Sequence, residues 1–100
     1  MVVGVVWLDL RLFDIHSLKQ KRSQVSRILN RLRSRFSISI VEVGHQDLLQ
    51  RAILGGSLVA GKEAIVQSVF RQIEEELYAS GSVELINMET EILNYGEEIH

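Results

Sequence analysis

One stretch of the chain, residues 17–35, constrains the fold most, because it has a helical pattern and lies between two runs that alternate like strands. Its apolar residues recur about every 3.6 positions, which puts them on one stripe of a helix: Leu18, Val25, Ile28, Leu29 and Leu32. Ser17 and Gln20 form the serine–x–x–glutamine pattern that caps a helix N-terminus. The stretch therefore predicts one amphipathic helix that begins directly after Ser17.

Four other segments alternate apolar and polar residues in the way that is typical of β-strands. They are residues 2–13, 36–43, 51–60 and 82–93. A second helical stripe lies in residues 61–80, and Gly81 is a natural end for that helix. The order βαββαβ predicts a ferredoxin-like α+β sandwich, with a four-stranded, mainly antiparallel sheet and both helices on one face. We expect the first and third strands to be central, and the fourth, which carries Glu84, Glu89 and Glu91, to be an edge.

Two strands show signs of irregular pairing. The alternation slips after Ile40, so Glu42 falls on the core side, which predicts a bulge or an inward-leaning carboxylate near the end of that strand. Gly55 and Gly56 interrupt the next strand and predict a second bulge or a close approach of another backbone. We also expect Glu42 and Arg51 to pair across this hairpin.

The length of 100 residues fits a single domain, residues 1–100, whose small core would gain stability from dimerisation. We expect a folded core over residues 2–93 and a polar, frayed tail over residues 94–100. The absence of cysteine excludes disulfides, thiol nucleophiles and cysteine-ligated metals. The N-terminus lacks the basic leader and cleavage site of a signal peptide, and no apolar run approaches the roughly 18 residues of a membrane span. We therefore expect a cytoplasmic protein with no membrane partner.

Positive charge is concentrated in the first helix. The first 50 residues hold eight basic and four acidic side chains, whereas the last 50 hold three and nine, and residues 17–35 carry seven cations and no acid. Five of these cations could bind RNA phosphates: Lys19, Arg22, Arg27, Arg31 and Arg33. The alternative is an ordinary solvated face, because the chain has none of the aromatic pairs, GXXG loops or glycine-rich cradles of known RNA-binding domains. No specificity for DNA is predicted.

The first strand is apolar on both faces in its first half. Val3, Val5 and Trp7 would lie on the sheet face that the helices leave open. Apolar patches of this kind usually contact a partner, so we expect a homodimer that buries this face.

The beginning of the basic helix resembles the S-L-K-x-K-R motif of the YlxP-like family of small bacterial proteins. The similar parts are Ser17-Leu18-Lys19-Gln20-Lys21-Arg22, Val41-Glu42-Val43, Gln46-Asp47 and Gln50-Arg51-Ala52-Ile53-Leu54-Gly55. The resemblance extends over residues 2–93, and one departure is Leu49, where the family has an aromatic residue, often tryptophan. The resemblance to this family implies a ferredoxin-like fold and a dimer. Genes of the family often lie among those for translation initiation and ribosome maturation, and the family implies no established activity.

Polar residues of the connections give little support to catalysis. A metal or acid–base site could be suggested by four residues of the connections: Glu42, His45, Asp47 and His16. However, no two of them have a helical metal-ligand spacing such as H-E-x-x-H. We therefore predict no catalytic residue, metal or cofactor. Three functions stay open: an RNA- or ribosome-associated accessory factor in translation, a homodimeric interaction module without catalysis, and, by analogy of fold alone, a small-ligand regulatory domain.

Overall fold

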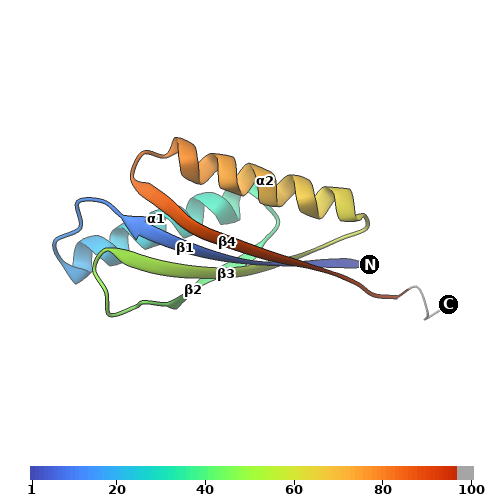
Figure 1. The fold of residues 1–100 in the computed structure, drawn as a ribbon, viewed down its shortest axis with the longest axis horizontal. Helices are drawn as coiled ribbons and strands as arrows, with labels where there is room; N and C mark the ends of the chain where they lie inside the picture. The colour runs from blue at the N-terminus through green and yellow to red at the C-terminus, as the bar shows by residue number, and fades with distance from the viewer. Residues whose placement is uncertain (97–100) are drawn as a thin grey trace.

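A computed structural model of the protein describes residues 1–96 and has the predicted order βαββαβ (Figure 1). The elements are β1 (Val2–Leu12), α1 (Leu18–Arg35), β2 (Ser39–Gly44), β3 (Arg51–Ala60), α2 (Glu63–Ala79) and β4 (Val83–Asn94). The sheet order is β2-β3-β1-β4, and every neighbouring pair is antiparallel. The predicted ferredoxin-like fold is confirmed, with β1 and β3 in the centre and β4 at an edge.

The first helix begins and ends where local hydrogen bonds dictate. Ser17 Oγ accepts from the Gln20 N–H at 3.1 Å, and Gln20 Oε1 accepts from the His16 N–H at 2.7 Å, which forms the predicted capping arrangement. After α1, the Ile38 N–H donates to the Phe36 carbonyl at 2.9 Å in a tight turn. Strand β2 therefore begins at Ser39, three residues later than the alternation predicts.

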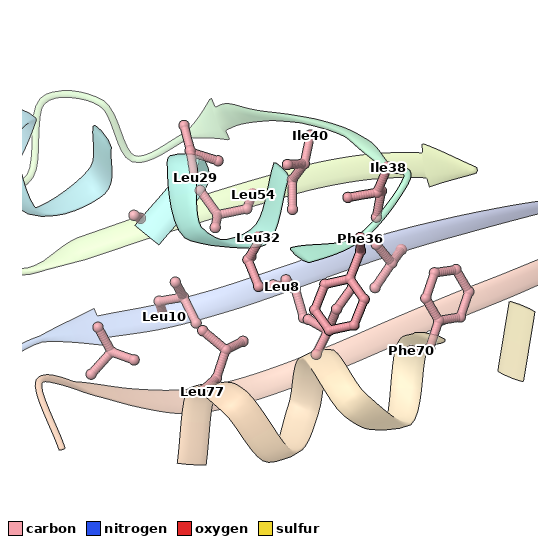
Figure 2. Packing of buried hydrophobic residues seen from close by; sticks show 14 of the residues in the cluster. Leu8, Leu10, Leu29, Leu32, Phe36, Ile38, Ile40, Leu54, Phe70 and Leu77 are labelled. Carbon is pink, nitrogen blue, oxygen red and sulfur yellow. The ribbon is translucent and has the colours of Figure 1, made fainter. Parts of the chain in front are cut away.

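The hydrophobic core lies between the sheet and the two helices (Figure 2). Even-numbered residues of β1 such as Leu8 and Leu10 meet Leu32 of α1 and Leu77 of α2. Helix α2 lies so close to β1 that a Cβ at Gly4 would stand 2.3 Å from Val66 Cγ1. The helices therefore seal one face of the sheet. The core prediction is wrong for one residue, because Leu18 in the first turn of α1 is exposed.

Two register shifts bend the sheet. The β2–β3 pairing shifts between Glu42 and Gly44, which confirms the predicted bulge and makes Val43 the extra residue. The β1–β4 pairing shifts between Asp9 and Leu10, and the sequence pattern did not predict this second bulge. The pairing of β3 is continuous through Gly55 and Gly56, so the two glycines instead allow close approach of β2 atoms.

The ends of the described chain pair with each other. The Tyr95 N–H donates to the Met1 carbonyl at 2.8 Å, and the Met1 ammonium donates to the Tyr95 carbonyl at 2.8 Å. Pairing therefore extends past residue 93, into the segment that we expected to be frayed, and residues 97–100 of that segment lie outside the described residues. Within residues 1–96, neither helix combines the length and apolar character that a membrane span requires.

Candidate functional site

The face of the sheet opposite the helices carries a continuous group of apolar side chains. The strand register brings these residues together on four neighbouring strands: Val3, Val5, Trp7, Val41, Val43, Ile53, Val59 and Leu93. We call this group the open-face patch. The exposed fractions are 62% for Val59, 54% for Val43 and 50% for Val41, while Trp7 is half-buried. The structure thus brings the predicted residues Val3, Val5 and Trp7 together with valines from β2 and β3.

One ion pair lies on the same face. Arg51 Nη2 donates to both carboxylate oxygens of Asp9, at 2.8 and 2.9 Å, and only 13% of the Asp9 side chain is exposed. Asp9 is paired in register with Ile53, so the contact runs diagonally between the two central strands. The predicted pair between Glu42 and Arg51 is wrong, because Glu42 is in register with Leu54 and lies on the helix side of the sheet, while Arg51 lies on the open side.

Glu42 pairs instead with a buried lysine of α1. The Lys21 ammonium lies 3.3 Å from Glu42 Oε2 and donates to the His45 carbonyl at 2.5 Å, and only 3% of its side chain is exposed. A buried ammonium must be paired in this way, because the loss of its hydration is costly. His45 has a positive φ of 57°, which turns the β2–β3 connection toward α1.

A second contact joins the same end of the molecule. Gln50 Nε2 donates to the Ile15 carbonyl at 3.3 Å, and the Leu12 N–H donates to the Gln50 carbonyl at 2.9 Å. Leu49 stands where the YlxP-like family has an aromatic residue, and it is half-buried and packs against the core. The motif residues therefore hold the start of α1 and the ends of β1 and β2 together.

Four of the seven α1 cations are engaged inside the molecule. Lys21 binds Glu42, and the Arg33 guanidinium donates twice to the Ile40 carbonyl, at 2.7 Å from Nη2 and 3.2 Å from Nε. Arg31 and Arg35 both pair with Glu76 of α2, whose side chain is 6% exposed. Arg31, one of the five predicted RNA-binding residues, is therefore already paired, although 64% of its side chain is exposed.

Three cations of α1 stay in solvent. Lys19, Arg22 and Arg27 are exposed and make no ion pair within residues 1–96, although Arg27 donates to Gln24 Oε1 at 3.4 Å. The five predicted RNA-binding residues thus divide into three that are available and two, Arg31 and Arg33, that already have partners.

The polar connections hold no metal-like cluster. Across residues 1–96, no three histidine or carboxylate side chains are gathered as metal ligands would be. Of the four polar residues considered above, Glu42 is bound by Lys21, and His45 contributes its backbone carbonyl to the same lysine.

The chain matches the family described as "Protein of unknown function (DUF503)" over residues 3–90. It belongs to the DUF503 family. A relative in Bacillus subtilis (strain 168), the "Uncharacterized protein YlxP", is 31% identical over 72 residues, which are 72% of this chain and 78% of the relative. The resemblance to the YlxP-like family is therefore confirmed.

Two solved structures are similar to this DUF503 chain. The de novo designed protein Ferredog-Diesel is 12% identical with a TM-score of 0.45, over 89% of this chain and 83% of the designed one. A putative chlorite dismutase, TA0507, is 13% identical with a TM-score of 0.55, over 92% of this chain and 44% of that protein. At this level of identity the similarity to TA0507 shows the fold alone.

Sequence reasoning missed two residues that define these surfaces. Asp9 reads as an ordinary polar position of β1, and its pairing with Arg51 depends on contact between strands that are far apart in the sequence. Glu76 lies within a run of three glutamates on α2, and helical periodicity places it beside Leu77 at the margin of the core. The position of Glu76 at the margin of the core was the one sequence signal that its carboxylate could contact α1.

Proposed function

We propose that this DUF503 protein is an interaction module without a catalytic role, and that it self-associates through the open-face patch. The observation that carries the proposal is the exposure of valines from three strands on a sheet face that no helix covers: Val5, Val41, Val43 and Val59. Exposed apolar groups that adjoin one another favour burial against a partner, because water is released from both surfaces.

A second copy of the chain suits this patch as its partner. The side chains of the patch are uncharged, and the neighbouring Asp9 and Arg51 neutralise each other. The exposed Arg11 lies at one end of the same face, beside Arg51, and the glutamates of β4 lie along one margin. Two copies can therefore face each other without opposing like charges at the centre of a symmetric interface.

The size of the sheet is consistent with a reversible dimer. Four strands of 11, 6, 10 and 12 residues, about 4.8 Å apart and rising roughly 3.3 Å per residue, give a face of about 600 Å². A standard interface buries about 800 Å² per partner. The expected association is thus of modest affinity.

The test is the sedimentation of the wild type and of Val59→Glu at high micromolar concentration. Because Val59 is 62% exposed, a glutamate there leaves the core intact but places a charge in the interface. We expect a wild-type dimer and a monomeric, fully folded V59E. The matched control is Tyr78→Glu, which changes a 65% exposed aromatic residue of α2. A monomeric wild type, or an equal loss of dimer in Y78E, would contradict the proposal.

A second candidate function is an RNA- or ribosome-associated accessory factor. The observation that favours it is the group of three exposed α1 cations without an ion pair in residues 1–96, namely Lys19, Arg22 and Arg27. Such a group supports phosphate binding through counterion release, although it is smaller than the seven cations of the helix suggest. The small-ligand regulatory domain has only the analogy of fold in its favour and stays a prediction.

A further inference from the structure

The two edges of the sheet are protected against strand pairing in different ways. An unprotected edge exposes a row of backbone N–H and C=O groups that another strand can bind. Strand β4 carries glutamates along its length. Strand β2 has no Lys, Arg or Pro, and its exposed Val41 and Val43 favour pairing. The bulge at Val43 and the short length of β2 protect this edge in part, and a further protection comes from another part of the chain.

That protection comes from α1. The Ser39 carbonyl oxygen lies 2.9 Å from where a Cβ of Gly56 would stand, so this carbonyl points toward β3. Since successive carbonyls of a strand point in opposite directions, the Ile40 carbonyl points away from β3, to the free edge. Both hydrogen bonds of Arg33 end on this oxygen, at 2.7 and 3.2 Å.

The next outward carbonyl has a weaker partner. It belongs to Glu42, and Gln46 Nε2 donates to it at 3.5 Å. The Arg33 contact carries a full positive charge and two donors, so it is the stronger of the two. The tight turn at residues 36–38 makes it possible, because it brings β2 back along the last turn of α1.

We infer that Arg33 keeps a strand-pairing surface at the β2 edge closed, and that this edge pairs with β2 of a second copy when the guanidinium is removed. An antiparallel pair with Val41 opposite Val41 would let Ile40 of each copy exchange backbone hydrogen bonds with Glu42 of the other. These two residues are the ones whose backbone groups point outward, so the register satisfies both edges symmetrically. The pairing groups of this surface are the outward backbone groups of Ile40 and Glu42, whereas the open-face patch is made of side chains, and Val41 belongs to both surfaces.

The test uses the V59E background, in which association through the patch is prevented and only edge pairing is measured. We expect V59E to sediment as a monomer, and the double variant with Arg33→Ala to form dimers at high micromolar concentration. Hydrogen exchange at the Ile40 and Glu42 amides should slow at least tenfold at the higher protein concentration. The experiment on Arg33 also works if the patch proposal is wrong. A wild type that is itself monomeric, or a dimer that Y78E disrupts equally, still leaves V59E as a monomeric background.

Three further variants make the outcome specific. Arg33→Met keeps the apolar stem and removes every donor, so it tests the same idea if the alanine variant is poorly folded. Adding Val41→Lys to either double variant should restore the monomer, because two ammonium groups would lie opposite each other at the symmetry axis. Arg22→Ala on the V59E background is the matched control and should stay monomeric. Folded but monomeric Arg33 variants, with unchanged exchange at Ile40 and Glu42, would overturn the inference.

Discussion

The buried ion pair between Lys21 and Glu42 gives the strongest single prediction for stability. Lys21→Met keeps the length of the side chain and removes its charge, so it leaves the Glu42 carboxylate and the His45 carbonyl without their ammonium partner. Breaking a buried pair on one side costs about 3–5 kcal/mol. Since the Glu42 side chain is 20% exposed and can recover some hydration, we expect a loss of about 2–4 kcal/mol.

That loss is a large part of the total for a domain of this size, whose free energy of unfolding is typically about 5–15 kcal/mol. Each kcal/mol lowers the melting temperature by roughly 4–8 °C, so a loss of about 2–4 kcal/mol in Lys21→Met should lower it by about 8–30 °C. The assay is thermal and urea unfolding followed by circular dichroism.

A double-mutant cycle with Glu42→Gln measures the pair itself. Because each single change leaves a buried group without its partner, the double variant should be more stable than the sum of the two losses predicts, by about 1–2 kcal/mol. A melting temperature of Lys21→Met within about 2 °C of the wild type, or strictly additive losses, would refute the reasoning that the ammonium is structurally required.

The exposed cations of α1 and the close approach at Gly4 each allow a further test. The triple variant Lys19→Glu, Arg22→Glu and Arg27→Glu should melt like the wild type, because exposed charges add little to stability. If α1 binds RNA, the same variant should lose ribosome or RNA association, with a salt slope about three units smaller; unchanged association at two salt concentrations would remove that function. Gly4→Ala should cost about 1–3 kcal/mol in urea unfolding because its Cβ would collide with α2, whereas Gly61→Ala, which has open space around it, should cost far less.

The fold could be predicted from the sequence because its signals are local. The capping pattern at Ser17, the helical stripe that follows and the slip of alternation after Ile40 each depend on residues a few positions apart. The first two were found in the structure, since local pattern and global packing agree. The irregularity of β2 lies at Val43, after a regular alternation from Ile40 to Glu42. The start of β2 was missed because the apolar–polar alternation of the sequence already begins at Phe36, whereas the backbone forms a turn over residues 36–38 before the strand begins.

The pairing of charged groups could not be predicted in the same way. The sequence distance between Arg51 and Asp9 is 42 residues, and that between Arg35 and Glu76 is 41. Which carboxylate meets which cation depends on strand register and on the orientation of two helices. Glu42 is the clearest case, because its register with Leu54 turns the carboxylate to the helix side, toward Lys21 and away from Arg51.

The location of the family motif bears on where function should be sought. Lys21, Glu42 and Gln50 make contacts between chain segments that meet at one end of the molecule, and Arg51 joins the two central strands. Residues with such contacts can carry a family resemblance for structural reasons alone, so the motif by itself indicates a shared architecture. The groups that remain available to a partner are the open-face patch and the three α1 cations that make no ion pair within residues 1–96, and they lie mostly outside those contacts. Experiments on function should therefore change these surface residues, some of which, such as Lys19, Arg22 and Val41, also belong to the motif. Variants of the motif residues that make internal contacts should be interpreted through their stability first.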